Sequence, residues 1–104
     1  MDIEERDGHG VLAVQGRLNL SNADEFRYAV GEALQAGSVR LVVDLTAADS
    51  VDSTGLGALI WAATSARREG GWLKLTHANE SVRMLLKLAN TSSVLPIVED
   101  TESN

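Results

Sequence analysis

A nearly continuous run of β-branched and aliphatic residues, VRLVVDL at 39–45, constrains the fold more than any other segment of this chain. Such a run is typical of a central strand that is buried on both faces of a sheet. Amphipathic helical patterns precede and follow it, and a strand set between helices favours parallel neighbours and right-handed connections. We therefore expect an α/β fold in which helices pack against a mixed sheet.

Helical spacing of apolar residues occurs in three segments. These segments are 20–37, 55–68 and 79–90. Ser21, followed by Asp24, is predicted to cap the first helix, and Asn79 is predicted to cap the third. The inward face of the second helix is predicted to hold Leu56, Leu59, Ile60 and Ala63.

Apolar runs bounded by turn residues predict five strands. The predicted strands are 2–6, 10–18, 39–45, 72–77 and 94–100. The turn DGHG joins the first two into an antiparallel hairpin, and Pro96 places the last strand at an edge of the sheet. Residues 46–53 are predicted to form a loop. The expected order of elements is ββαβαβαβ.

Length and charge limit the classes of protein to which the chain can belong. Its 104 residues suffice for one domain, predicted over 1–98, which is followed by an acidic tail over 99–104 that we expect to be frayed. The formal net charge of −6 disfavours nucleic acid and anionic membrane surfaces as partners. Cysteine is absent, and no segment has the pattern of a signal peptide or a membrane-spanning helix. We therefore expect a cytoplasmic protein that does not insert into membranes.

No segment carries a recognisable motif for catalysis or cofactor binding. The stretch GLGALI lacks the third glycine of a dinucleotide fingerprint, and no P-loop motif occurs. His9 and His77 have no further ligands at metal-binding spacing. A triple of Ser53, His77 and Asp44 can be assembled, but any chain of this size offers such triples. The sequence therefore predicts a binding module rather than an enzyme, without a metal or cofactor.

The second helix begins with DSTGLG, which is an unusual start for a core helix. Gly55 and Gly57 each cost roughly 1 kcal/mol relative to alanine in a helix interior. No glutamate or glutamine stands three residues after Asp52, Ser53 or Thr54, so no capping box forms. We therefore interpret this start as open rather than optimised, and as available to a partner. The alternative, that these three polar residues only cap the helix, stays open.

A large aromatic residue, Trp61, falls on the outward side of the same helix. At about 100° per residue, Gly57 and Trp61 lie away from the apolar stripe. A tryptophan in this position is typical of an anchor for another protein. The alternative is that a loop or the opening hairpin covers it, and the sequence favours neither interpretation.

At these residues the chain resembles a known family, the bacterial anti-sigma factor antagonists, whose fold is called the STAS domain. The resemblance covers almost the whole chain and rests on the stretches GRLNLSNADEF, LVVDLTAADSVDSTGLGALI and SVRMLLKLANTSSVLPI. In the family, the first hydroxyl residue after the aspartate of D-S-[ST]-G-L is phosphorylated by an anti-sigma factor that is also a protein kinase. The resemblance implies that this residue is Ser53, with Thr54 as the weaker candidate.

The resemblance also implies a mechanism and its partners. The unphosphorylated domain would bind the anti-sigma kinase around Ser53 and so free a sigma factor for transcription, and phosphorylation would end the binding. A serine phosphatase would be a second partner. Gly55 and Gly57 would then let the kinase approach the Ser53 backbone closely. The predicted contact residues are Asn19, Asp52, Ser53, Thr54, Gly55, Leu56, Gly57 and Trp61.

One residue departs from the pattern of the family. Many phosphorylated members carry an aspartate after G-x-L of the second strand, where this chain has Asn19. Asparagine can hydrogen-bond a serine hydroxyl but supplies no negative charge. With Asn19 taken into account, the sequence supports efficient phosphorylation of Ser53 less strongly than the stretch DSTGLGAL does alone. An ordinary turn residue is the other interpretation of Asn19.

Two other roles are compatible with the fold class. STAS domains also act as scaffold components of stress-sensing assemblies and as subunits of lipid-transport ABC systems. Nucleotide hydrolysis or phosphotransfer by the domain itself is disfavoured, because the sequence has neither a phosphate loop nor metal ligands.

Overall fold

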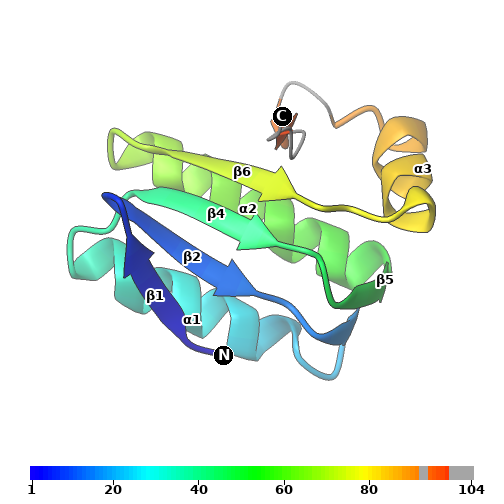
Figure 1. Ribbon diagram of the computed structural model, residues 1–104, viewed down its shortest axis with the longest axis horizontal. Coiled ribbons are helices and arrows are strands. Elements are labelled where there is room, and N and C mark those ends of the chain that lie inside the picture. The colour runs from blue at the N-terminus through cyan, green and yellow to red at the C-terminus, as the bar shows by residue number, and fades with distance from the viewer. Residues whose placement is uncertain (92–93, 99–104) are drawn as a thin grey trace.

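The computed structural model describes residues 1–91 and 94–98. Figure 1 shows a sheet in front of two long helices, with a third helix at one end. The helices are α1 (Ala23–Gln35), α2 (Ser53–Arg68) and α3 (Glu80–Leu88). The strands are β1 (Ile3–Arg6), β2 (His9–Ala13), β3 (Gly16–Leu18), β4 (Arg40–Asp44), β5 (Ala48–Val51), β6 (Trp72–Thr76) and β7 (Ile97–Val98).

The main sheet has the strand order β1-β2-β4-β6-β7, in which β1 is antiparallel to β2 and the other pairs are parallel. The expected mixed sheet is therefore confirmed. Strand β4 lies in the middle, as the run at 39–45 predicts. Strand β7 follows Pro96 and lies at an edge, as that proline predicts. Strands β3 and β5 pair in parallel as a separate small sheet.

The expectation that the central strand is buried on both faces is wrong. Along β4, Leu41 and Val43 are buried, but Val42 between them is only half-buried. Both α1 and α2 lie behind the main sheet in Figure 1. The strand order explains this arrangement, because two right-handed crossovers that step across a sheet in the same direction place their helices on the same face.

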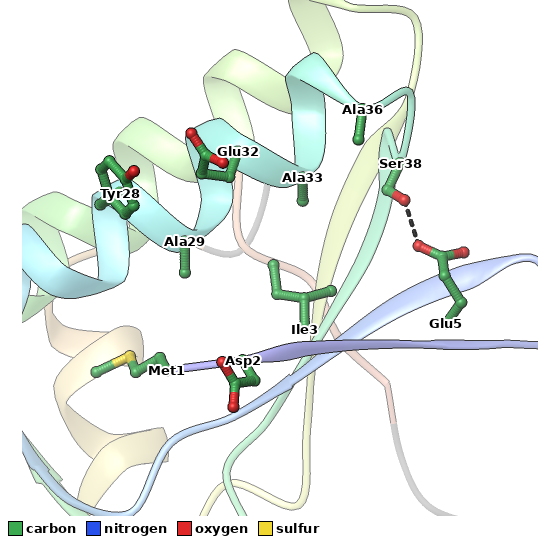
Figure 2. Close-up of a pocket in the computed structure, with 10 residues that line it drawn as sticks. All are labelled: Met1, Asp2, Ile3, Glu5, Tyr28, Ala29, Glu32, Ala33, Ala36 and Ser38. Atoms are coloured by element: carbon green, nitrogen blue, oxygen red, sulfur yellow. Dashed lines mark hydrogen bonds between the residues drawn. The ribbon is translucent and has the colours of Figure 1, made fainter.

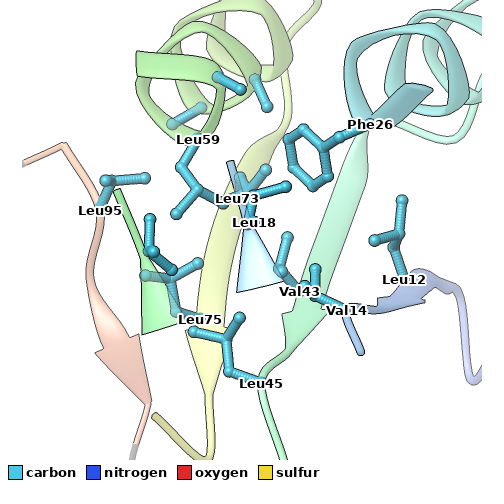
Figure 3. Packing of buried hydrophobic residues seen from close by; sticks show 14 of the residues in the cluster. Leu12, Val14, Leu18, Phe26, Val43, Leu45, Leu59, Leu73, Leu75 and Leu95 are labelled. Carbon is cyan, nitrogen blue, oxygen red and sulfur yellow. The ribbon is translucent and has the colours of Figure 1, made fainter. Parts of the chain in front are cut away.

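The core lies between the main sheet and the helices α1 and α2 (Figure 3). Phe26 of α1 and Leu59 of α2 are fully buried there, against leucines and valines of the sheet. Full burial of one such side chain stabilises the fold by about 1.5–3 kcal/mol. The strands and their ends contribute Leu12, Val14, Leu18, Val43, Leu45, Leu73 and Leu75.

Helix α2 meets the rest of the protein through small residues. Its buried positions are Gly55, Ala58, Leu59, Ala62, Ala63 and Ala66. The predicted inward face is therefore confirmed: Leu59 and Ala63 are buried, and Leu56 and Ile60 are half-buried and pack against the same core. Since alanine and glycine bring a helix close to its neighbours, Leu59 is the only large side chain among these six buried positions.

The predicted strand over 10–18 is two strands. Strand β2 ends at Ala13, and β3 begins at Gly16, whose φ of +72° favours glycine. The loop predicted over 46–53 contains a further strand, β5, which pairs with β3. Both β3 and β5 are too short for the alternation of apolar and polar residues to identify them.

The predicted start of α3 is confirmed, whereas the predicted starts of α1 and α2 differ from the structure. Asn79 caps α3 as predicted, and its Oδ1 accepts a hydrogen bond from the helix backbone at 2.8 Å. Ser21 does not cap α1, because the N-cap position is Asn22, which makes no side-chain capping hydrogen bond. Helix α2 begins at Ser53 rather than at Gly55.

Two further expectations concern the membrane and the C-terminal tail. No helix within the residues that the structure describes is long and apolar enough to cross a bilayer. The predicted tail over 99–104, and the last residues of the strand predicted over 94–100, lie outside the described residues.

Candidate functional site

The start of α2 lies beside the turn that follows β3. Strands β3 and β5 are parallel, with Leu18 opposite Val51, so the residues that follow the two strands leave the small sheet at the same edge. The backbone N–H of Asp52 donates to the carbonyl oxygen of Leu18 at 3.1 Å. Asn19 and Asp52, which are far apart in the sequence, are therefore neighbours in the fold.

Asp52 caps α2. Its Oδ1 accepts a hydrogen bond from the backbone N–H of Gly55 at 2.8 Å, and its carbonyl oxygen accepts one from Leu56 at 2.8 Å. The capping alternative is therefore confirmed for Asp52, and the helix start is less open than the missing capping box indicates. A side-chain cap of this kind stabilises a helix by about 1 kcal/mol.

Ser53 is the first residue of α2, and it is exposed. Because Asp52 supplies the cap, the helix does not need the Ser53 hydroxyl. That hydroxyl makes no hydrogen bond within the part of the chain that the structure describes. Thr54 is half-buried, so Ser53 is the more accessible of the two candidate hydroxyl residues.

The two glycines of the first turns have different roles. Gly55 is buried, and a Cβ added there would lie 2.2 Å from the carbonyl oxygen of Leu18. Gly55 therefore lets α2 pack directly on β3, and the expectation that it leaves room for a partner is wrong. A Cβ added at Gly57 would meet nothing within 4 Å. Gly57 is exposed, and its contact with a partner stays a prediction.

Asn19 is held in a compact turn. Its Oδ1 accepts hydrogen bonds from the backbone N–H of Ser21 at 3.0 Å and from the Ser21 hydroxyl at 2.6 Å. Its own backbone N–H donates to Oδ1 of Asn22 at 2.9 Å. Between described residues, no hydrogen bond joins Asn19 to Ser53, so the bond that an asparagine could offer to the serine is not formed here.

Exposed apolar side chains lie on α2, on α1 and in the turn between β3 and α1. Trp61 of α2 is 39% exposed, which decides against its coverage by a loop or hairpin. Trp61 and Tyr28 of α1 border a hollow of about 480 Å³, and Tyr28 is 70% exposed. Leu20, which follows Asn19, is 78% exposed. Our sequence interpretation missed Leu20 and Tyr28, although Leu20 is an apolar residue in a polar turn.

A carboxylate–imidazole pair lies at the ends of β4 and β6. His77 Nδ1 is 3.4 Å from Asp44 Oδ1, which also accepts hydrogen bonds from Thr46 N at 3.0 Å and Oγ1 at 2.6 Å. Burial favours a raised pKa for Asp44, but the bonds from Thr46 and the nearby imidazole outweigh it and hold that pKa below its ordinary value. In the described ranges Ser53 makes no hydrogen bond to this pair, so no triad forms.

The structure also bears on metal binding. No three histidine, aspartate or glutamate side chains among residues 1–91 and 94–98 are placed to hold a metal ion together. The chemistry available at the start of α2 is therefore that of one accessible hydroxyl at a helix N-terminus, beside carboxylates and exposed apolar groups.

The whole chain matches one known family, since the model of the STAS domain matches residues 1–104. BtrV of Bordetella bronchiseptica is 25% identical over 103 residues, which cover 99% of this chain and 89% of that protein. A protein of Paenibacillus polymyxa named anti-sigma F factor antagonist is 27% identical, over 96% of this chain and 88% of its own. The crystal structure of a Thermotoga maritima protein, 28% identical, has a TM-score of 0.87 over 97% of this chain and 86% of that one. The chain therefore belongs to the STAS domain family.

Proposed function

We propose that the protein is an anti-sigma factor antagonist whose binding is switched by phosphorylation of Ser53. The unphosphorylated domain binds an anti-sigma factor that is also a serine kinase, and thereby frees a sigma factor. Phosphorylation of Ser53 ends this binding, and a serine phosphatase restores it. The name of the Paenibacillus polymyxa relative supports the class of function, and the exposed hydroxyl at the start of α2 supports the switch.

The observation that carries the proposal is that Asp52, and not Ser53, caps α2. Since Oδ1 of Asp52 holds the Gly55 N–H, a phosphoryl group on Ser53 leaves the cap in place. The positive end of the helix dipole also favours a negative group at this position. We therefore expect the fold to be the same in the two forms.

Phosphorylation changes the charge of the surface instead. A phosphoserine carries roughly −1.5 to −2 charges at pH 7. Asp52 is exposed directly before Ser53, and Asp49, four residues before Ser53, is exposed too, so the chain that leads into the helix is already negative. A partner surface shaped for a neutral hydroxyl would meet a dianion, and a loss of about 3–4 kcal/mol would lower the affinity several-hundred-fold.

The proposed partner surface extends from Ser53 along α2. Gly57 and Trp61 follow at intervals of four residues and lie on the same side of the helix. Trp61 is about 12 Å beyond Ser53 at 1.5 Å per residue. We expect the tryptophan to act as an anchor, with Gly57 leaving space for a partner side chain between the two.

The test compares Ser53→Asp with Ser53→Ala and with a matched control, Ser81→Asp. Ser81 is an exposed serine in the first turn of α3, so the control adds the same charge at another helix start. In a pull-down with the cognate anti-sigma kinase and ATP, Ser53→Asp is expected to lose binding while Ser53→Ala and Ser81→Asp retain it. Unchanged binding of Ser53→Asp would refute the switch.

Intact mass spectrometry tests the modification itself. Incubation with the kinase and ATP is expected to add about 80 Da to the wild-type chain, the mass of one phosphoryl group. The same incubation should leave Ser53→Ala unmodified. If Ser53→Ala gains the same adduct in equal yield, the phosphorylated residue is another one, and Thr54 is the first candidate.

A further inference from the structure

A hollow of about 450 Å³ lies between α1 and β1, at one edge of the main sheet. Figure 2 shows Ala29 and Ala33 of α1, and Ala36 directly after the helix, pointing toward the strand, and Ile3 of β1 pointing toward the helix. On the helix side this hollow, which we call the β1 hollow, is therefore lined by alanine methyl groups together with Tyr28 and Glu32. The short side chains leave the space between helix and strand unfilled.

The β1 hollow exists because β1 is an edge strand. Within the described sheet β1 pairs only with β2, so its other side presents unpaired backbone groups. Ile3 and Glu5 alternate along β1 and both line the hollow, and Glu5 accepts a hydrogen bond from Ser38. One more strand beside β1 would place its inward side chains in the hollow, against the alanines of α1.

Acidic side chains surround the β1 hollow. Asp2, Glu5 and Glu32 line it, whereas no lysine, arginine or histidine side chain of the described residues does. The terminal ammonium group of Met1 pairs with Glu25 at 2.7 Å. The whole chain carries a formal net charge of −6, so no excess of positive charge elsewhere offsets this acidic rim. An occupant with cationic side chains is therefore favoured.

We propose that β1 and the β1 hollow bind an extended segment of a partner protein that carries lysine or arginine at alternate positions. The backbone of the segment pairs with the unpaired side of β1 and extends the sheet. Its inward side chains lay their aliphatic stems against Ala29 and Ala33, and their charged heads reach Glu5 and Glu32. Lysine and arginine match this hollow because each combines an apolar stem with a cationic end.

A second copy of this chain is a poorer occupant. An antiparallel pairing of β1 with its own counterpart that engages most of IEER places a glutamate opposite a glutamate. It also brings together two sets of Asp2, Glu5 and Glu32. Like charges that face each other across a strand pair are destabilising, so the charge pattern favours a basic partner over self-association.

The test uses the full chain and a fluorescent octapeptide in which threonine and lysine alternate. Fluorescence polarisation at low salt is expected to show saturable binding, which weakens as added salt screens the charges. NMR chemical shifts are expected to change at the amides of 2–6 and on the facing side of α1. A peptide of the same composition, with its lysines in one block, is expected to bind about tenfold more weakly.

Charge reversal on β1 provides a matched pair of variants. Glu5→Lys places a cation in the β1 hollow and is expected to weaken peptide binding by about tenfold or more. Glu4→Lys makes the same change of charge on the same strand, but Glu4 pairs with Arg6 and lines a hollow that Glu5 does not line. It is expected to leave binding within about twofold of the wild type. Ala33→Leu fills the space without a charge and should also weaken binding.

Several results would overturn the inference. One is that the alternating peptide shows no saturable binding, and another is that the block peptide binds as tightly as the alternating one. A third is that Glu4→Lys and Glu5→Lys weaken peptide binding equally. The last is that sedimentation shows a dimer of the wild-type chain that Ala33→Leu abolishes. Ser53→Asp is expected to bind the peptide as the wild type does. The inference can therefore fail while the phosphorylation switch stands, and the switch can fail while the inference stands.

Discussion

Replacement of Gly55 by alanine is expected to destabilise the protein, although alanine is the better helix former. The new Cβ would lie 2.2 Å from the carbonyl oxygen of Leu18. Carbon and oxygen atoms normally approach no closer than about 3.3 Å, so the overlap is about 1 Å. Because the obstructing atom belongs to the backbone, no side chain can rotate to relieve it. Either α2 or β3 must move.

The magnitude follows from two opposing effects. Overpacking usually destabilises a protein by up to about 3 kcal/mol. We use this upper value, because a backbone atom such as the Leu18 carbonyl oxygen cannot move aside easily. The higher helix propensity of alanine offsets about 1 kcal/mol of this loss in the free energy of unfolding. We therefore expect a net loss of about 2 kcal/mol in the free energy of unfolding. Gly57→Ala, where the added Cβ is unobstructed, is expected to gain up to about 1 kcal/mol.

Thermal and urea unfolding, each followed by circular dichroism, measure both variants. At about 4–8 °C per kcal/mol for a domain of this size, Gly55→Ala should lower Tm by roughly 8–16 °C, whereas Gly57→Ala should raise it by a few degrees. The m-value should not change, since the same surface is exposed on unfolding. If the two variants prove equally stable, the packing contact between α2 and β3 is not the reason for glycine at position 55.

The remaining predictions concern the cap, an acidic group and the anchor. Asp52→Ala is expected to lower the free energy of unfolding by about 1 kcal/mol in chemical denaturation, whereas Asp52→Asn keeps an acceptor and most of the stability. Because the folded-state pKa of Asp44 is lowered, its contribution is present above the unfolded pKa of about 4 and is lost as pH falls through the folded value. Asp44→Asn should therefore have a lower Tm than the wild type at neutral pH, and a pH-independent difference would contradict this assignment. Trp61→Ala is expected to weaken kinase binding by about tenfold or more in calorimetry, and equal affinity would remove the anchor role.

Long elements of the fold could be predicted from the sequence because their patterns extend over several turns or alternations. Phe26 and Val30 on one face of α1 are an example, and both are buried. Strands β3 and β5 could not be predicted, because each has too few residues for a period to emerge. Their pairing depends on a contact between segments far apart in the chain, which no local pattern records.

The candidate site shows the same limit. Exposure of Trp61 agrees with the outward position that helical spacing gives it, and Ser53 is exposed as the family resemblance implies for a phosphorylated residue. The role of Gly55 was misread, because the carbonyl oxygen of Leu18 that requires glycine belongs to a strand which the sequence did not reveal as separate. Leu20 was missed for a related reason, since its exposure depends on how the turn after β3 is folded.

The direct contact of α2 with the backbone of β3 has a consequence for association. The Gly55 position and the Asp52–Leu18 hydrogen bond fasten the first turn of the helix to the strand that leads into Asn19 and Leu20. These two parts of the proposed surface should therefore keep their relative geometry in the absence of a partner. Association would then lose little conformational entropy, and more of the contact energy would remain as affinity.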